Sequence, residues 1–377
     1  MVVGILKEPV GENRVSLLPE GVRSLTDRQI EVWVETHAGF QAFADDADYI
    51  AAGAKIISRE EVLGGADLIL AIHSPDASAI SRAKKEAVWL GAYDPLHRLS
   101  FFQEFAATGA TVFSLDNIPR TTRAQSMDVR SSQASIAGYK AVLMAAYTYG
   151  RYFPMFMTAA GSIAPAKVLV LGAGVAGLQA IATARRLGAV VEVFDTRPAV
   201  KEEVMSLGGK FIEVEGASDP SEAGGYAVEQ SEQYQQRQKQ KIAESVQKAD
   251  IVITTAQIPG REAPKLVTKA MIEKMRPGSI IIDLAADSGG NTEITKDQDT
   301  VQYRGVAVIG QSNLPSSMPS DASKLYGKNV LNFLKLLIGE DGALHLDFED
   351  DLVSGTCITH GGKIVNERVK KFFQLSD

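Results

Sequence analysis

The stretch that decides the fold covers residues 168–195 and reads VLVLGAGVAGLQAIATARRLGAVVEVFD. It contains an apolar run, a glycine-rich turn, a helical pattern and a second apolar run that ends at Asp195. In such a sequence Gly172 permits a tight turn, Gly174 lets the backbone approach a pyrophosphate, and Gly177 lets the helix pack closely on the strand. The acidic residue comes 18 residues after the last glycine, where the dinucleotide-binding fingerprint needs it. The stretch therefore predicts a Rossmann fold that binds a dinucleotide.

The residues that flank the glycine turn indicate which ligand is expected. The helix begins at Val175 and Ala176, and the free N–H groups and positive dipole of a helix N-terminus favour a phosphate group. Asp195 closes the second strand, where its carboxylate can accept a hydrogen bond from a ribose 2′-hydroxyl and would repel a 2′-phosphate. Thr196 and Arg197 follow, and Arg197 is the one residue here that favours a 2′-phosphate. We expect NAD(H) rather than NADP(H).

Short apolar runs alternate with helical patterns along the chain, which is typical of parallel α/β sheets. The runs expected as strands are 2–6, 31–35, 55–57, 67–72, 87–91 and 111–114, then 167–171, 190–194, 210–214, 250–254, 279–284 and 306–309. The second series of six fits a doubly wound sheet with the strand order 3-2-1-4-5-6. Long helices are expected at 132–153, which stops before Pro154, and at 321–338.

These patterns predict two α/β domains that are joined by the long helices and have a cleft between them. The first domain is expected to combine residues 1–130 with the C-terminal segment 320–377. The dinucleotide-binding domain is expected to cover residues 131–319.

The ends of two further strands are candidate parts of the binding site, because ligands of such sheets lie at the carboxyl ends of the strands. Thr255, Ala256 and Gln257 come at the end of the fourth strand, and residues 283–287 come at the end of the fifth. Their small side chains would allow a nicotinamide ring to lie flat. A simple turn of small residues is the alternative interpretation.

The composition narrows the class of protein. The 377 residues include 46 Asp and Glu against 39 Lys and Arg, a net charge of −7, so no basic surface for nucleic acid is expected. The single Cys357 excludes a disulfide framework and a multi-cysteine metal site. No run reaches the roughly 20 apolar residues of a membrane-spanning helix, and the N-terminus lacks a signal-peptide pattern. We expect a soluble cytoplasmic protein without a metal.

Residues 216–241 interrupt the alternation with a polar, glutamine-rich insertion. An insertion of this length between strands is usually a functional loop or an unstructured linker. Gly224 and Gly225 can act as a hinge, and Tyr226 follows them directly. We expect a lid that closes over the ligand, and a solvated linker is the alternative.

The segment 118–133 joins the first domain to the long helix and carries polar and charged side chains without histidine or lysine. Oxidation of an alcohol or amine by NAD needs a base to remove a proton, and this segment offers none tuned near neutral pH. Among the five histidines only His97, in a loop of the first domain, is a candidate for that base. From the residues alone, the segment is either a ligand-holding loop or a capped turn between domains.

Several of these segments together resemble the NAD(H)-binding component of proton-translocating NAD(P) transhydrogenase. The similarity is carried by KEPVGENRVSLLPEGV (7–22), PRTTRAQSMDVRSSQASIAGYKAV (119–142), LVLGAGVAGLQAIATARRLGA (169–189), FDTRPAVKEEVMSLGGKF (194–211), GGYA (224–227), TTAQIPGREAP (254–264), DLAADSGGNTE (283–293) and LVSGTCITHGGKIV (352–365). The motifs are long and cover nearly the whole chain. The wider superfamily includes alanine dehydrogenase, which shares the first motif and the glycine turn.

The resemblance implies a reaction that needs no base. In that family the junction loop holds the nicotinamide of NAD(H) beside the nicotinamide of NADP(H) bound on a separate component, and hydride passes directly between the rings. The family's loop positions correspond to Arg120, Gln125, Asp128 and Ser131, and its mobile-loop tyrosine corresponds to Tyr226. The resemblance further implies a Re/Si-specific enzyme and a homodimer that docks on NADP(H)-binding and membrane-spanning subunits. It would be a peripheral protein at the cytoplasmic face of the inner membrane.

Two alternatives stay open. An alanine dehydrogenase-like amino-acid oxidoreductase would use Arg14, which is retained, and His97, which aligns loosely with the catalytic histidine. The lysine of those enzymes is missing from residues 67–73. A scaffold protein that binds NAD without chemistry would need neither the polar junction segment nor Tyr226.

Overall fold

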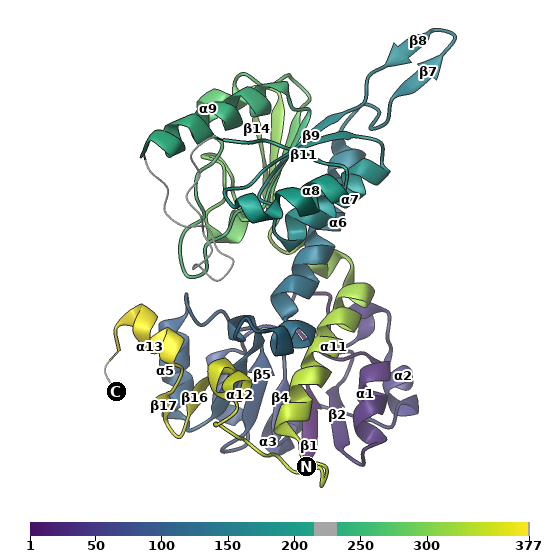
Figure 1. The fold of residues 1–377 in the computed structure, drawn as a ribbon. Coiled ribbons are helices and arrows are strands. Elements are labelled where there is room, and N and C mark those ends of the chain that lie inside the picture. The colour runs from purple at the N-terminus through teal and green to yellow at the C-terminus, as the bar shows by residue number, and fades with distance from the viewer. Residues whose placement is uncertain (215–231, 376–377) are drawn as a thin grey trace. The chain divides into compact units, whose positions relative to one another are not determined.

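The computed structural model describes residues 1–214 and 232–375, and most of the polar insertion lies outside these ranges. The chain divides into two compact units, one formed by Met1–Gln133 with Pro315–Asp377 and the other by Ala134–Leu314. Each unit is built on one main sheet flanked by helices (Figure 1). The predicted fold class of two α/β domains, one of them a doubly wound Rossmann sheet, is confirmed.

The second unit holds a seven-stranded sheet in the order β11-β10-β9-β12-β13-β15-β14. Its strands are β9 (Lys167–Leu171), β10 (Val190–Phe194), β11 (Lys210–Phe211), β12 (Ile251–Thr254), β13 (Ile280–Asp283), β14 (Asp299–Tyr303) and β15 (Val306–Gly310). Six of them run parallel, and the predicted order 3-2-1-4-5-6 is confirmed. β11 ends three residues before the prediction, because only Glu192 and Val193 of β10 pair with it.

The edge strand β14 is missing from the sequence-based prediction. It pairs antiparallel with β15 along its whole length. Four of its five residues are polar or aromatic rather than aliphatic, and none is fully buried, so no apolar run marks it in the sequence. The rule that finds buried central strands therefore does not find this one.

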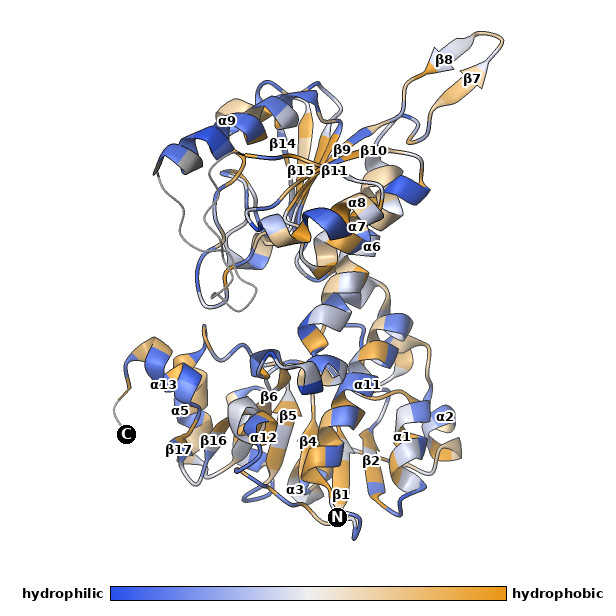
Figure 2. Cartoon of the chain, in the orientation of Figure 1, coloured by the Kyte–Doolittle hydropathy of each residue, from blue (hydrophilic) through white to orange (hydrophobic). Residues whose placement is uncertain are grey.

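Alternating side chains build a core on each face of the seven-stranded sheet. Val168 and Val170 of β9 pack with helix α7 (Val175–Arg186) on one face, and Leu169 and Leu171 pack on the other. All four side chains are almost completely buried. Figure 2 shows the hydrophobic strands inside and the hydrophilic α9 (Glu232–Lys248) outside. Ile242 and Val246 of α9 pack in the same core as Leu169 and Leu171.

The first unit repeats the same parallel order with an antiparallel extension. Its strands are β1 (Val2–Ile5), β2 (Glu31–Glu35), β3 (Lys55–Ile57), β4 (Leu68–Leu70), β5 (Val88–Gly91), β6 (Thr111–Ser114), β16 (Cys357–His360) and β17 (Lys363–Ile364). Their order is β17-β16-β6-β5-β4-β1-β2-β3. β16 pairs antiparallel with β6, so the C-terminal segment completes the sheet that β1 begins. β4 is shorter than the predicted strand 67–72 at both ends.

The two long helices have different bounds from those predicted. α6 spans Val129–Thr148 instead of 132–153, and α11 spans Pro319–Leu337 instead of 321–338. α6 begins early because the Asp128 carboxylate accepts a hydrogen bond from the backbone N–H of Ser131 (3.0 Å), which is the contact of an N-cap residue. Within the described ranges, no helix combines the length and the hydropathy of a membrane-spanning segment.

The remaining helices are short. They are α1 (Pro19–Thr26), α2 (Asp46–Ala51), α3 (Arg59–Gly65), α4 (Ala77–Arg82), α5 (Leu99–Ala107), α8 (Lys201–Ser206), α10 (Lys269–Ile272), α12 (Asp351–Thr356) and α13 (Glu367–Phe373).

An unpredicted hairpin follows α6. It consists of β7 (Phe156–Thr158) and β8 (Gly161–Ile163), which pair antiparallel and extend away from the seven-stranded sheet (Figure 1). Tyr152 stacks on Phe156 with ring centroids 4.8 Å apart, and Met157 is 72% exposed. The hairpin therefore presents apolar side chains that the described part of the chain leaves exposed.

Candidate functional site

The glycine turn lies at the carboxyl end of β9, between the ends of β10 and β12. Gly172 has φ +105°, a conformation that side chains rarely adopt, which explains the glycine. A Cβ on Gly177 would overlap the carbonyl oxygen of Gly172. Gly174 differs, because its backbone is extended and a Cβ there would have no atom within 4 Å. The space beside Gly174 is open to a ligand.

Helix α7 starts at this turn. Gly174 is its N-cap residue and has no side chain to satisfy the N–H groups of the first turn, those of Val175 and Ala176 among them. The Val175 side chain is 42% exposed. Behind the turn, α6 packs so closely that a Cβ on Gly138 would overlap the carbonyl oxygen of Ala176. α7 is thus held from behind and offers its N-terminal N–H groups to an anion.

Asp195 and Arg197 form an ion pair at the end of β10. Oδ2 of Asp195 accepts hydrogen bonds from the backbone N–H of Ala173 (2.7 Å) and from Nη2 of Arg197 (2.9 Å). Oδ1 accepts from the backbone N–H of Arg197 (2.8 Å) and from its Nε (2.9 Å). The hydrogen-bonded Asp195 raises the pKa of the Arg197 guanidinium. The carboxylate expected to bind the ribose therefore also ties the glycine turn to β10, and the half-buried Thr196 lies between the paired residues.

The segment after β12 contacts the glycine turn from the other side. Oγ1 of Thr255 donates a hydrogen bond to the carbonyl oxygen of Gly172 (3.0 Å). Ala256 is half-buried, whereas Gln257 is exposed and donates from Nε2 to Oδ1 of Asp287 (3.2 Å). The structure brings this segment, the turn and the end of β10 together at one sheet edge. Tyr226 of the predicted lid lies outside the described residues.

Sequence reasoning missed the side chain that holds this segment. Asn291 is fully buried, and its amide bonds to both the N–H and the carbonyl group of Ala256. Asp283, the last residue of β13, accepts a hydrogen bond from the backbone N–H of Asn291 (2.6 Å). The signal in the sequence was an asparagine directly after two glycines, Gly289 and Gly290. Both glycines have positive φ in the structure.

The four predicted junction-loop residues lie in the first unit. Asp128 and Ser131 meet, because Oδ2 of Asp128 accepts from Oγ of Ser131 (2.6 Å) in addition to the capping bond. Arg120 and Gln125 are exposed, and Gln125 belongs to the 3₁₀ helix η3 (Thr122–Met127). The contacts of Asp128 are those of a helix cap, and the side chains of Arg120 and Gln125 face solvent.

Helix α11 braces this loop. Nδ2 of Asn329 and Nδ2 of Asn332 both donate to the carbonyl oxygen of Ser126, at 2.8 and 3.1 Å. On the other side, the Arg123 guanidinium pairs with Asp350 at the start of α12. Contacts from α11 and from the start of α12 therefore hold the loop that carries Gln125.

A buried polar cluster near the carboxyl ends of β1 and β4 contains Arg14. Nε and Nη2 of Arg14 donate to Glu12 (2.8 and 2.6 Å), and Nη1 donates to Oε1 of Gln133 (2.9 Å). Nε2 of His73 lies 2.7 Å from Glu12. Burial favours the neutral acid, but the hydrogen bonds from Arg14 and His73 outweigh it and hold the pKa of Glu12 below its ordinary value. Glu12 is therefore a carboxylate that already neutralises Arg14.

Glu8 is the second buried carboxyl group of this cluster. Burial raises its pKa to about 7, although the backbone N–H groups of Ile72 (2.6 Å) and His73 (3.0 Å) donate to it. His97, the candidate base, instead lies at the surface and pairs with Asp94 (2.8 Å). The structure therefore does not bring His97 into the buried cluster.

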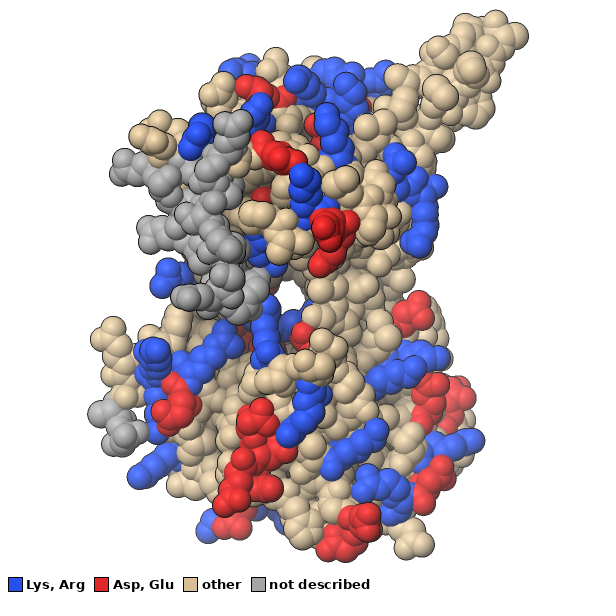
Figure 3. All heavy atoms as spheres, in the orientation of Figure 1, with Lys and Arg blue, Asp and Glu red and all other residues tan. Residues whose placement is uncertain are grey.

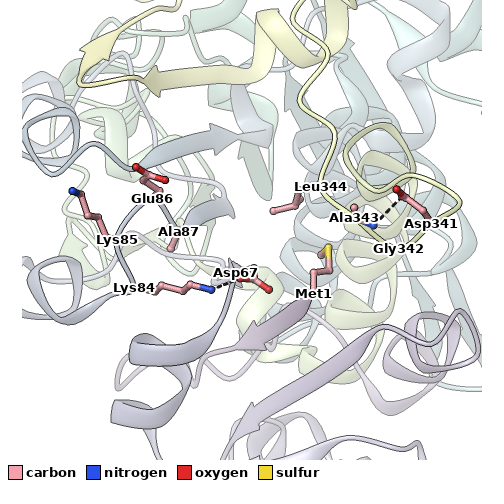
Figure 4. A pocket seen from close by; sticks show the side chains of 10 residues that line it. All are labelled: Met1, Asp67, Lys84, Lys85, Glu86, Ala87, Asp341, Gly342, Ala343 and Leu344. Atoms are coloured by element: carbon pink, nitrogen blue, oxygen red, sulfur yellow. Dashed lines mark hydrogen bonds and ion pairs between the residues drawn. The ribbon is translucent and has the colours of Figure 1, made fainter.

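A cavity of about 480 Å³ lies at the opposite edge of the first sheet (Figure 4). Met1, Asp67 and Ala87, which precede β1, β4 and β5, contribute to its lining. Asp67 accepts from the backbone N–H of Val2 (2.7 Å) and pairs with Lys84. Because ligands of open α/β sheets bind at the carboxyl ends of the strands, this cavity is not the candidate site.

Charged side chains of both signs are interspersed over the described part of the face seen in Figure 3. This face shows no broad field of one sign.

Comparisons with known proteins cover nearly the whole chain. Residues 4–137 match the family described as alanine dehydrogenase/PNT, N-terminal domain, and residues 141–367 match alanine dehydrogenase/PNT, C-terminal domain. In Rhodospirillum rubrum, the first polypeptide of the NAD(P) transhydrogenase alpha subunit is 44% identical to this chain. The match covers 97% of this chain and 98% of that polypeptide. The NAD(P) transhydrogenase subunit alpha of Haemophilus influenzae is 41% identical over 96% of this chain and 71% of its own length.

A solved structure agrees with these matches. The transhydrogenase from Sinorhizobium meliloti superimposes with a TM-score of 0.86 at 42% identity, covering 98% of this chain and all of its own. The predicted resemblance is confirmed, and the chain belongs to the alanine dehydrogenase/PNT family, on the branch of the NAD(P) transhydrogenase alpha subunits.

Proposed function

We propose that this chain is the NAD(H)-binding component of a proton-translocating NAD(P) transhydrogenase. Hydride passes directly between NAD(H) bound here and NADP(H) bound on a partner component, and a separate membrane component couples this transfer to proton translocation. The observation that carries the proposal is the open space beside Gly174 at the uncapped start of α7, between the ends of β10 and β12. Such a space fits a pyrophosphate.

The residues at this edge fit the rest of a dinucleotide. N–H groups of Val175 and Ala176 would hold the pyrophosphate. Asp195 and Arg197 stand on the β10 side, where the adenosine ribose would lie, and the segment after β12 stands on the other side. The bound NADH supplies the hydride, and the chain's own groups bind and orient it.

In this proposal the junction loop positions the nicotinamide and moves no proton. Hydride that leaves the ring carbon of NADH is accepted by the ring carbon of NADP⁺, so no base is needed. Orientation replaces acid and base catalysis when the reacting atoms are held about 3–3.5 Å apart. Arg120 and Gln125 offer exposed hydrogen-bond donors for the carboxamide and ribose, and Asp128 with Ser131 fixes the start of α6, which follows them in the chain.

We also propose a homodimer that docks on the NADP(H)-binding and membrane-spanning subunits at the cytoplasmic face of the inner membrane. The apolar hairpin β7–β8 supports a second copy as one partner, because Met155 and Met157 are 63% and 72% exposed. Met157→Lys should shift the sedimentation of the protein from dimer to monomer. A wild-type protein that sediments as a monomer would contradict the dimer alone.

The function is tested by mixing this chain with a transhydrogenase NADP(H)-binding component and following NADH-dependent reduction of a thio-NADP analogue. Turnover in the mixture, and none with either protein alone, is the expected result. The alternative amino-acid oxidoreductase would show NADH oxidation with pyruvate and ammonia by this chain alone. The pairing of Arg14 with Glu12 and Gln133 disfavours that alternative, because the guanidinium already serves two partners.

A further inference from the structure

We propose that Asn291 is a positioning residue that shapes the loop 256–264 and so places the nicotinamide half of bound NAD(H). The inference rests on the proposed function and goes beyond it, because it names a buried side chain in place of the exposed groups already described. Asn291 follows β13 and lies 35 residues after Ala256 in the chain.

The amide of Asn291 closes the loop at both ends. Its Oδ1 accepts from the backbone N–H of Ala256 (3.0 Å), and its Nδ2 donates to the carbonyl oxygen of Ala256 (2.8 Å). The same Nδ2 donates to the carbonyl oxygen of Pro264 (2.9 Å) at the far end of the loop. Between these pinned ends, the exposed tip carries Gln257 and Ile258. One side chain thus fixes the base of the loop and leaves its tip at the surface.

Asn291 is itself held in place. Oδ2 of Asp283 accepts from the backbone N–H of Asn291 (2.6 Å) and from Oγ1 of Thr295 (2.6 Å). The carbonyl oxygen of Asn291 accepts from the backbone N–H groups of Leu266 (2.8 Å) and Val267 (3.0 Å). Because its backbone groups are anchored to the end of β13, Asn291 transmits the position of that strand to the loop after β12.

The sheet order decides which part of the ligand this loop meets. β9 carries the glycine turn at its end, and β10 and β12 flank it on opposite sides. Asp195 at the end of β10 marks the adenosine side, and the pyrophosphate lies at the start of α7. The remaining half of the dinucleotide therefore runs toward the end of β12, where Ala256 lies. Thr255, which bonds to Gly172, joins this segment to the turn.

Asparagine is the side chain that suits this position. It must accept from one N–H group and donate to two carbonyl oxygens, and an amide provides both functions. Aspartate has nearly the same volume but would place its oxygens against the carbonyl groups of Ala256 and Pro264. Alanine would remove the hydrogen bonds to all three of these partly buried backbone groups, which is costly.

The experiment compares Asn291→Asp and Asn291→Ala with wild type in binding NADH and ADP-ribose, which lacks nicotinamide. Dissociation constants come from NADH fluorescence and from calorimetry. The matched control is Asn366→Ala in the first unit, since Asn366 is equally buried and its amide bonds to Gly355, Cys357 and Val369. We expect about a tenfold or greater loss of NADH affinity in both Asn291 variants. Affinity for ADP-ribose should change by less than about threefold, and the control should lose stability without losing affinity for either ligand.

Three results would overturn the inference. NADH affinity equal to wild type in Asn291→Asp shows that the loop is not set by this amide. Equal losses for NADH and ADP-ribose show a general structural role. A wild-type chain that binds neither ligand refutes the proposed function itself, and the inference with it. If Asn291→Ala does not fold, Asn291→Asp still decides, because it keeps the volume and the acceptor for the Ala256 N–H group.

Discussion

Replacing Gly174 with alanine should weaken NADH binding by roughly ten- to hundredfold while leaving the fold intact. Gly174 has φ −77°, which alanine adopts readily, and the added methyl group meets no protein atom within 4 Å. Alanine is a poorer N-cap residue than glycine by up to about 1 kcal/mol. It also lowers the entropy of the unfolded chain, which stabilises the fold by about 0.4–1 kcal/mol. These two effects oppose each other, so the free energy of unfolding should stay within about 0.5 kcal/mol of wild type.

The affinity should change far more, because the methyl group occupies the space that the pyrophosphate needs. Losing one hydrogen bond to a charged group costs about 1.5–3 kcal/mol, which is a roughly ten- to hundredfold loss of affinity. Fluorescence titration with NADH measures the affinity, and urea unfolding measures the stability. Gly174→Ala that binds NADH as tightly as wild type would refute the argument that the ligand approaches this backbone.

Two matched variants separate the causes. Gly64→Ala places a methyl group in equally open space, but within α3 of the first unit, so it should leave the NADH affinity unchanged and raise the free energy of unfolding by about 0.5–1 kcal/mol. Gly177→Ala forces a methyl group onto the carbonyl oxygen of Gly172, so it should lower the free energy of unfolding as well as the affinity.

Four further outcomes are expected. Asp128→Ala should lower the free energy of unfolding by about 1 kcal/mol through loss of the α6 cap. Asp128→Asn keeps a capping oxygen and should lower hydride transfer more than NADH affinity; unchanged transfer would leave capping as the only role. Burial raises the pKa of Glu8 from its ordinary 4.5 to about 7, so the folded state binds this proton more tightly. The stabilisation is full below pH 4.5 and is lost as the pH rises to about 7. Urea unfolding across this range should show that the free energy of unfolding of the wild type declines with pH, and that Glu8→Gln reduces this decline. Equal pH dependence of the free energy of unfolding in both proteins would contradict the argument. Asp195→Asn removes the carboxylate that pairs with Arg197 and would repel a 2′-phosphate, so the ratio of NADPH to NADH dissociation constants should fall. A constant ratio would show that this carboxylate does not select the nucleotide.

The parallel strands and the glycine turn were accessible from the sequence because their causes are local or repetitive. Strands such as β9 and β13 are buried on both faces, so they appear as uninterrupted apolar runs. The early start of α6 was also within reach, since Asp128 and Ser131 have the spacing of an N-cap contact. The hairpin β7–β8 was not predicted, because its strands have three residues each and expose their apolar side chains.

The Rossmann sheet, its strand order, the place of the glycine turn and the family could all be predicted from the amino-acid sequence. These follow from apolar periodicity and from motifs whose residues are neighbours in the chain. Two features become visible only in the folded chain: the carboxylate of Asp195 bonds to Arg197 and to the Ala173 N–H group, and the amide of Asn291 bonds to Ala256. Hydrogen bonds between groups far apart in the chain depend on how strands align in space, and a buried amide finds its partners only once β12 and β13 lie side by side.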